Sequence, residues 1–346
     1  MVRKILYALL ALGPLVVLAD HLGAGDIELF VLAALALIPL AWLIGEATEH
    51  AAHYTGPGIG GFLNATFGNA PELIIALFAV HDGLTEVVRG SLTGSVVGNL
   101  LLVLGFSLAF GGRGELDRGS SMTSLGLVGF AVVVFLIPAI PGWTGDPDRH
   151  SLAVLSVPVS IVLLVVYVVV TWISLRRHRQ QHVSDESTDM AAWSFRTALL
   201  VLGGATVITA LVAEILVGSL EAFAEKAHLS DFFVAAVIVA IVGNAAEHGG
   251  AIVIASRGKL RLATEIAVSS SAQVALLVTP AVALLSWLVR PALPLTFRPI
   301  ELAAMGGAAA LVALLLADGR GRRWEGFLLV AVYVGVAFGF YVAGDR

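Results

Sequence analysis

The sequence predicts an all-α, polytopic membrane protein built from two inverted repeats, and three observations support this. Of its 346 residues, 58% are hydrophobic and 13% are charged, about half the charge content of an ordinary soluble domain. Apolar blocks of 18 or more residues recur along the chain, as in proteins with many membrane-spanning helices. A short phrase occurs twice: Gly-Asn-Ala-Pro-Glu at 68–72 and Gly-Asn-Ala-Ala-Glu at 243–247, 175 residues later.

The apolar blocks predict about eleven transmembrane helices. The first also resembles a signal peptide, because Arg3 and Lys4 precede a short apolar run; we expect it to be retained. The predicted spans are 5–19, 28–50, 60–80, 91–110, 121–140, 151–175, 195–218, 231–255, 262–289, 299–317 and 325–343.

The distribution of Lys and Arg predicts a cytoplasmic N-terminus. With that orientation, 14 of the 20 basic residues face the cytoplasm and 6 face the other side, which follows the positive-inside rule. The chain then divides into a first helix (1–25), a first repeat (26–175), a cytoplasmic linker (176–194) and a second repeat (195–346). The linker is interpreted as a solvated connection, and a regulatory helix is the alternative.

The two copies of the phrase should run in opposite directions, because five helices separate them. This is the pattern of an inverted-topology repeat, in which the site lies at mid-membrane between the halves. Glu72 is the only charged residue within 59–80, and Glu247 is the only one within 232–255. A carboxylate at the centre of a membrane helix costs about 2.5–3.5 kcal/mol. Two such residues in matching contexts indicate one site built from two halves.

The repeated phrase offers oxygen ligands for a hard cation. Asn69 and Glu72 are three residues apart and should share a helix face, as should Asn244 and Glu247. Carboxylate and amide oxygens are the ligands that calcium prefers. Pro71 cannot donate a backbone hydrogen bond, which predicts a helix break that exposes carbonyl oxygens. The second copy lacks the proline, so a softer break is expected there.

Other polar residues are candidates for a secondary proton or ion pathway, although each could equally be solvated or join helices by hydrogen bonds. These are Glu49, Glu214, Ser95, Asn99, Ser270, Gln273 and His248. The His50–His53 pair lacks the spacing of a helical zinc-hydrolase motif. Without cysteine, disulfides and thiolate chemistry are excluded. The sequence contains no nucleophile–base pair that indicates an enzyme, and no basic block that indicates nucleic-acid binding.

The residues at 61–76, with the phrase at 68–72, and those at 242–248 resemble the two signatures of the calcium/proton exchangers, the cation/proton branch of the cation/calcium exchanger superfamily. The resemblance extends from about Leu40 onward and includes 47–49 and 99–105. It implies eleven helices, with two inverted five-helix repeats (helices 2–6 and 7–11) after an extra first helix. It also implies calcium export driven by proton entry, with Glu72 and Glu247 as the shared site. Ser269, Ser271 and Gly98 depart from the family's pattern.

We therefore expect a secondary active antiporter that exchanges calcium, or a similar divalent cation, for protons by alternating access. A monovalent cation/proton exchanger is the alternative, and a passive cation channel is a weaker one. No prosthetic group is expected; calcium and protons are the substrates, membrane lipid surrounds the protein, and a homo-oligomer is left open. The expected location is the plasma (inner) membrane of a prokaryote.

Overall fold

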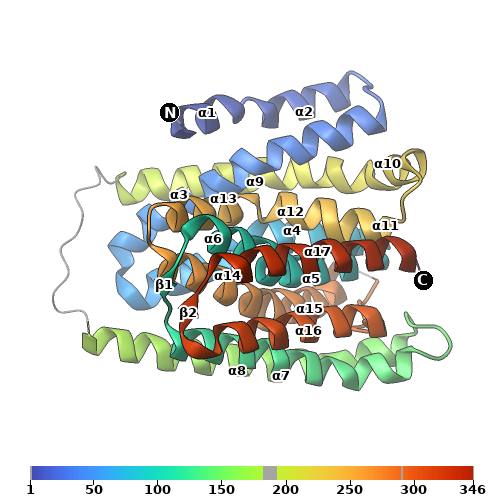
Figure 1. Cartoon of the computed structure of the whole chain (residues 1–346). Coiled ribbons are helices and arrows are strands. Elements are labelled where there is room, and N and C mark those ends of the chain that lie inside the picture. The colour runs from blue at the N-terminus through green and yellow to red at the C-terminus, as the bar shows by residue number, and fades with distance from the viewer. Residues whose placement is uncertain (1, 182–192, 290, 346) are drawn as a thin grey trace.

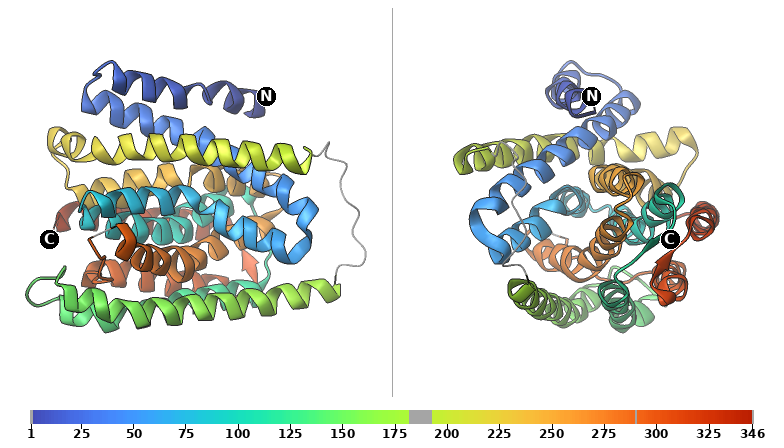
Figure 2. Two further views of the ribbon diagram at one scale, coloured as in Figure 1. Left: turned by 180° about the vertical axis from the view of Figure 1, so that it is seen from behind. Right: turned by 60° about the vertical axis from the view of Figure 1, so that its left-hand side comes forward.

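The structure is a computed structural model that describes residues 2–181, 193–289 and 291–345. Its helices run roughly side by side in one bundle (Figures 1 and 2). Before the linker, the elements are α1 (Val2–Leu9), α2 (Leu12–His21), α3 (Asp26–Gly68), α4 (Ala70–His81), α5 (Thr85–Val97), the π-helical turn η1 (Gly98–Val103), α6 (Leu104–Gly111), β1 (Gly114–Glu115), α7 (Arg118–Gly142) and α8 (His150–Gln181).

The second part of the chain repeats much of this order. Its elements are α9 (Phe195–Gly218), α10 (Leu220–Ala227), α11 (Asp231–Phe233), the π-helical turn η2 (Val234–Val239), α12 (Ala240–Gly243), α13 (Ala245–Ser256), α14 (Leu260–Gln273), the π-helical turn η3 (Val274–Val278), α15 (Thr279–Val289), α16 (Pro299–Leu315), the 3-10 turn η4 (Leu316–Asp318), β2 (Arg320–Gly321) and α17 (Arg323–Ala343).

The protein is an integral, multi-pass membrane protein. Among the described residues, nine helices are long and apolar enough to cross a membrane. The other two predicted spans, 60–80 and 231–255, are the ones that carry the repeated phrase. Each of them is interrupted within the phrase, at Asn69 and at Asn244. Nine of the predicted segments are therefore present among the described residues as apolar spans, and the two that carry the repeated phrase are interrupted at its asparagine.

Two predicted boundaries are wrong. The spans predicted at 28–50 and 60–80 are not separated between residues 51 and 59, because α3 is helical from Asp26 to Gly68. The first predicted helix is present as one apolar span from Lys4 to His21, with a turn between α1 and α2. α8 continues to Gln181, inside the predicted linker. The acidic part of the linker, 185–189, lies outside the described residues.

The bundle has two ends, which we name after the segments found there. At the linker end α8 ends, α9 begins, and β1 pairs antiparallel with β2; it is on the left in Figure 1. At the tail end, on the right, α17 ends near the connection between α7 and α8 (Figure 1). The last helix thus finishes at the end opposite the linker.

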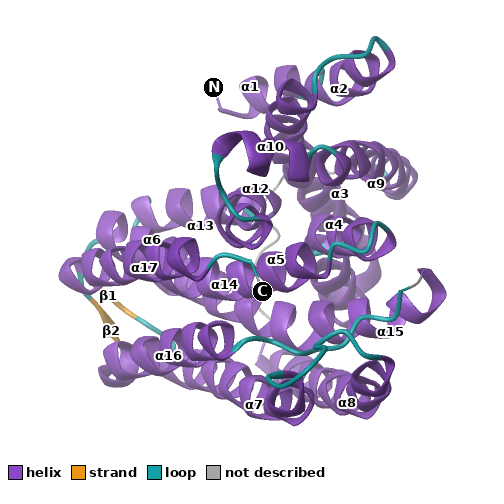
Figure 3. Ribbon diagram, turned by 90° about the vertical axis from the view of Figure 1, so that its right-hand side faces the viewer, coloured by secondary structure: helices purple, strands orange, loops and turns teal. Residues whose placement is uncertain are grey.

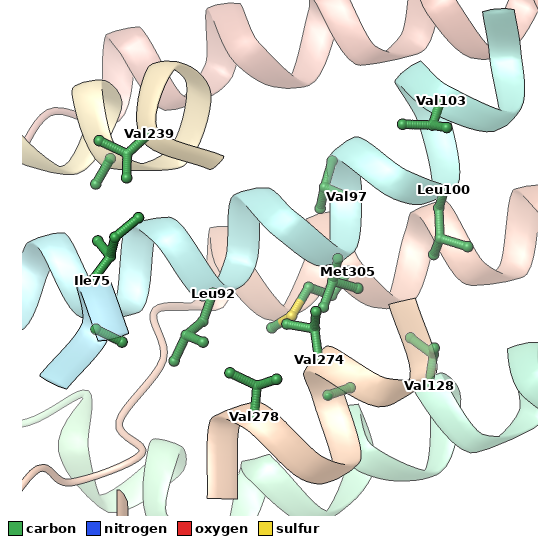
Figure 4. Close-up of a cluster of buried hydrophobic side chains, with 14 of the residues drawn as sticks. Ile75, Leu92, Val97, Leu100, Val103, Val128, Val239, Val274, Val278 and Met305 are labelled. Atoms are coloured by element: carbon green, nitrogen blue, oxygen red, sulfur yellow. The ribbon is translucent and has the colours of Figure 1, made fainter. Parts of the chain in front are cut away.

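The centre of the bundle contains one segment of similar build from each half. Viewed along the helices, α5 and α14 lie in the middle (Figure 3). Within 85–111, 89% of the residues of an apolar 18-residue stretch are buried inside the protein. In the corresponding stretch of α17 the buried share is 22%. Leu92 and Val97 belong to the same buried cluster as Val274 and Val278 (Figure 4). The repeat therefore extends from the motifs into the two central helices.

Glycines allow these central helices to approach their neighbours closely. A Cβ atom on Gly90 would lie 2.8 Å from the carbonyl oxygen of Phe232, and one on Gly94 would overlap the carbonyl of Ala236. Small residues at such crossings are typical of helix packing in membranes, where close backbone contact supplies the attraction. The spacing of the two glycines brings α5 directly against α11 and η2.

Replacing Gly94 with alanine should therefore destabilise the protein, because the added methyl group meets backbone that cannot move away alone. Overpacking typically costs about 1–3 kcal/mol. The control is Gly126→Ala in α7, where no atom lies within 4 Å of the added carbon, so the protein should unfold at an unchanged or slightly higher temperature. Thermal unfolding of both purified variants in detergent provides the measurement. Equal stability of Gly94→Ala and wild type would contradict the close approach.

Buried ion pairs close the tail end. Arg89 is 1% exposed, and its guanidinium lies 2.7 Å from Glu86 Oε1 and 2.8 Å from Asp148 Oδ1. Arg298 lies 2.7 Å from Glu301 Oε1 and stacks on the ring of Phe232. We call Glu86, Arg89, Asp148, Arg298 and Glu301 the tail-end ion-pair cluster. Removing one partner of a buried ion pair typically costs about 3–5 kcal/mol, so the cluster fixes the arrangement of helix ends here.

Candidate functional site

Both copies of the repeated phrase break their helix at the asparagine. Asn69 has φ −98° and ψ 14°, and Asn244 has φ −91° and ψ 4°; helix resumes at the next residue in each case. The prediction of a softer second break is wrong, since the two breaks match although only the first is followed by proline. In the second copy Asn244 Nδ2 donates to the carbonyl of Ala240 at 2.9 Å, and the Asn244 backbone N–H donates to the same carbonyl, so the amide side chain is tied to the preceding turn.

Each glutamate lies against the glycine of the opposite half. A Cβ atom on Gly243 would be 3.7 Å from Glu72 Oε1, and one on Gly68 would be 3.4 Å from Glu247 Oε1. Glu72 is 8% exposed, and Glu247 is partly buried. The carboxylate of Glu247 thus packs against the first half of the chain, and the carboxylate of Glu72 packs against the second half. The two motifs, 175 residues apart in the sequence, form one site.

The two asparagines are also held by the opposite half. Asn69 Nδ2 donates to Gln273 Oε1 at 2.9 Å, and Asn244 Nδ2 donates to Ser95 Oγ at 2.8 Å. In both cases the acceptor is on the helix that follows the other motif. This exchange of partners is what an inverted repeat with a site on its pseudo-twofold axis produces.

A hydrogen-bonded chain leads from His248 to Glu247. His248 Nε2 is 3.1 Å from Asn99 Oδ1, Asn99 Nδ2 donates to Ser270 Oγ at 3.1 Å, and the Ser270 hydroxyl donates to Glu247 Oε2 at 2.5 Å. Because an amide oxygen can only accept, the Nε2 atom of His248 must carry the hydrogen. The chain has no repeat-related counterpart, since Leu73 follows Glu72.

Two buried oxygen atoms in the site accept no hydrogen bond from the described residues. They are Glu72 Oε2 and Asn244 Oδ1. A cavity of about 10 Å³ lies beside Glu72 and is lined also by Ser91, Ser95 and Gly243. That volume suits one water molecule or one dehydrated ion. Because buried acceptors without a donor are costly, these atoms are suited to receive a proton or a cation.

The sequence profile of the family described as "Sodium/calcium exchanger protein" matches residues 27–176 and 197–342. The chain belongs to this family. It is 39% identical to the Ca(2+)/H(+) antiporter ChaA of Bacillus subtilis (strain 168), over 98% of this chain and 99% of that protein. The solved structure of native YfkE is 38% identical and superimposes with a TM-score of 0.84, covering 97% of this chain and 99% of that one.

The fold is shared more widely than the sequence. The crystal structure of the H+/Ca2+ exchanger CAX has a TM-score of 0.75 to this chain, with 17% identity, and covers 99% of this chain and 91% of that one. At this identity the likeness concerns the fold alone. Membership of the exchanger family agrees with the two inverted repeats predicted from the sequence.

Each of the two central helices, α5 and α14, is followed by a π-helical turn next to a polar residue of the site. η1 starts at Gly98, next to Asn99, and η3 starts at Val274, next to Gln273. Single π-helical turns occur often at functional sites, because the extra residue per turn frees backbone groups and redirects side chains. The two turns occupy corresponding places in the two halves, which places them on both sides of the site.

The predicted secondary residues fall into two groups. Ser95, Asn99, Ser270, Gln273 and His248 all belong to the buried hydrogen-bonded network around the motifs. Glu49 and Glu214 instead lie on exposed surfaces of α3 and α9, so their part in a proton pathway stays a prediction. Ser91 lines the cavity beside Glu72 and was not predicted. Its place one helical turn before Ser95 was the available signal.

The hydrogen-bonded chain from His248 to Glu247 predicts that His248 acts by holding Asn99 and Ser270 in place, and that its own charge is not needed. His248→Leu removes the donor to Asn99 Oδ1, which leaves a buried acceptor unpaired at a cost of about 1–3 kcal/mol. Asn99 can then rotate and release Ser270, so we expect the rate of calcium uptake to fall by about tenfold. His248→Gln keeps a side-chain N–H donor and should stay within about twofold of wild type.

Uptake of radioactive calcium into proteoliposomes, together with thermal unfolding of each variant, provides the measurement. A leucine variant as active as wild type would show that the chain does not position the site. A glutamine variant as impaired as the leucine variant would show that the imidazole has a role other than donating this hydrogen bond.

Proposed function

We propose that the protein is a secondary active antiporter that exchanges calcium for protons across a membrane and exports calcium from the cytoplasm. Its similarity to a Ca(2+)/H(+) antiporter along almost the full length of both chains supports this activity. The similarity to YfkE at a TM-score of 0.84 shows that the architecture required for it is present.

The observation that carries the proposal is the crossed arrangement of the two carboxylates. Glu72 and Glu247 come from opposite halves, and each faces the glycine of the other motif. Two carboxylates balance the charge of one divalent cation, which matters where water cannot screen it. We assign Glu72 and Glu247 as the charged ligands and Asn69 and Asn244 as neutral ones, a set of oxygens that suits calcium. A monovalent ion would leave one carboxylate uncompensated.

Exchange follows if the site cannot hold calcium and protons together. Calcium requires both carboxylates to be ionised, whereas the empty site in apolar surroundings favours their neutral forms. By alternating access the protein then carries either calcium or protons from one face of the membrane to the other. In this proposal calcium and protons are the transported substrates, and the protein needs no resident prosthetic group.

The orientation is also part of the proposal. We place the protein in the plasma (inner) membrane of a prokaryote, with the linker end in the cytoplasm. The basic residues support this direction: Arg113, Arg118, Lys259 and Arg320 all lie in or beside the short segments that close the linker end. Positively charged short loops remain preferentially on the cytoplasmic side.

Glu72→Gln and Glu247→Gln should each abolish calcium-driven proton flux while the protein remains folded. Each substitution removes one of two charges around a buried divalent ion, and the loss of a buried charge partner typically costs about 3–5 kcal/mol. The control is Glu225→Gln, which changes an exposed glutamate of α10 and should leave the flux unaltered. Proton movement reported by a pH-sensitive dye in proteoliposomes provides the measurement. Near-normal flux in either site variant would remove that residue from the site.

Calcium and protons should compete in wild-type protein. If both protons must leave before calcium binds, apparent calcium affinity should fall by up to about a hundredfold per unit of decreasing pH at the acidic end, by mass action. Calorimetric titration with calcium at several pH values provides the measurement. An affinity independent of pH would refute the shared site. Calcium flux without proton movement would favour a channel, and equal activity with sodium or potassium would favour a monovalent exchanger.

A further inference from the structure

A cleft at the linker end is lined mainly by arginines, none of which belongs to the transport site. It has a volume of about 460 Å³ and is lined by Gly112, Arg113, Arg322, Arg323 and Trp324. These residues follow the end of α6 or lie at and just before the start of α17, and the two helices pack against each other. A cleft of this size can hold a small ligand or the headgroup of a lipid.

The cleft contains positive charge that the described part of the chain does not neutralise. Arg322 is paired with Asp318 and with Glu325. Arg113 and Arg323, by contrast, are exposed, and the described part of the chain provides neither of them with an ion pair. Two uncompensated guanidinium groups in one cleft favour an anionic ligand, and guanidinium binds phosphate well because its N–H groups can donate in pairs.

The local backbone places the guanidinium group of Arg323 beside Gly112, the residue that precedes Arg113. Gly112 has φ +85°, and a Cβ atom there would lie 3.8 Å from both Nε and Nη2 of Arg323. Arg323 therefore extends over the turn that leads into Arg113. The turn requires glycine, since other residues rarely adopt such a φ value. The two arginines are thus brought to the same cleft by the fold.

The cleft lies at the border between charged and apolar surface. Trp324 is 55% exposed and Phe327 is 64% exposed on α17, and Phe110 is 60% exposed at the end of α6. Large apolar side chains exposed on membrane-spanning helices face lipid chains, and tryptophan is enriched at the level of the headgroups. The arginines are therefore at the depth of lipid phosphates, with hydrocarbon contacts directly beside them.

We propose that this cleft binds the headgroup of an anionic phospholipid. The phosphate lies between Arg113 and Arg323, the glycerol region contacts Trp324, and the acyl chains extend along Phe110 and Phe327. Basic pockets between transmembrane helices at the cytoplasmic side are suited to this kind of ligand. A second cleft of about 400 Å³ shares Arg113 and Arg322 but also contains Glu115, whose carboxylate disfavours a phosphate there.

The test compares anionic and zwitterionic lipid on purified full-length protein in detergent micelles. Brominated phosphatidylglycerol, titrated into the micelles, should quench tryptophan fluorescence more strongly than brominated phosphatidylcholine does. The difference should disappear in Trp324→Phe. In the double variant Arg113→Gln/Arg323→Gln the apparent affinity for phosphatidylglycerol should fall by about thirtyfold, equivalent to about 2 kcal/mol. The matched control Lys4→Gln/Arg196→Gln removes two exposed charges elsewhere and should change the affinity by less than about twofold.

Several results would overturn the proposal. These are equal quenching by the two lipids, unchanged affinity in the arginine double variant, and a difference in quenching between the two lipids that persists in Trp324→Phe. Displacement of the lipid by millimolar inorganic phosphate or glycerophosphate would assign the cleft to a soluble anion instead. The proposal stands apart from the transport mechanism, because Glu72→Gln should bind phosphatidylglycerol like wild type whatever its transport activity.

Discussion

The structure depends on bringing two carboxylates from opposite halves of the chain together where water is scarce. Neither half can do this alone, because each glutamate lies against the glycine of the other motif. A Cβ atom at Gly68 or Gly243 would already touch a carboxylate, so a side chain that extends beyond it would have to pass beside that carboxylate. The interrupted helices, the small residues at crossings and the hydrogen bonds exchanged between the halves all serve this requirement. Since an isolated charge is costly in apolar surroundings, the two halves are held in place together.

Much of the architecture could be predicted from the sequence, because its main determinants are local. A single acidic residue within an apolar stretch, repeated after an odd number of helices, predicted an inverted repeat with a shared site. The polar groups around that site were also recognisable, because Asn99, Ser270 and Gln273 lie within otherwise apolar segments. Which of them contact each other could not be predicted, since the hydrogen bonds join residues 149 to 204 positions apart.

Two of the errors concern where a helix ends within the membrane. The prediction ended one helix at residue 50 and began the next at residue 60, yet α3 is helical through the residues between them. In apolar surroundings an unpaired backbone group cannot turn to water, so a helix persists where it would otherwise end. Proline was likewise given too much weight at Pro71. The second break occurs without a proline, at an asparagine whose side chain bonds the preceding turn.

The two halves match around the site in backbone but not in side chains. The breaks at the asparagines and the π-helical turns η1 and η3 repeat, whereas His248 is replaced by Leu73 in the first half. Glu247 accepts a hydrogen bond from Ser270, while Glu72 has a buried oxygen without a donor among the described residues. A repeated local backbone thus gives its two acids different environments, which allows one to load and release differently from the other.

The tail-end ion-pair cluster makes the two ends of the molecule electrically unequal. There the halves are joined across charges, with Arg298 3.8 Å from Glu86 and Arg89 donating to Thr296. At the linker end the halves are joined by the two-residue ribbon of β1 and β2 and by an exposed ion pair between Asp117 and Arg261. Admitting water at the tail end requires work against Coulomb attraction in a poorly screened setting. At the linker end the ion pair is already exposed to solvent, so charge attraction contributes less to holding the halves together there than it does at the tail end.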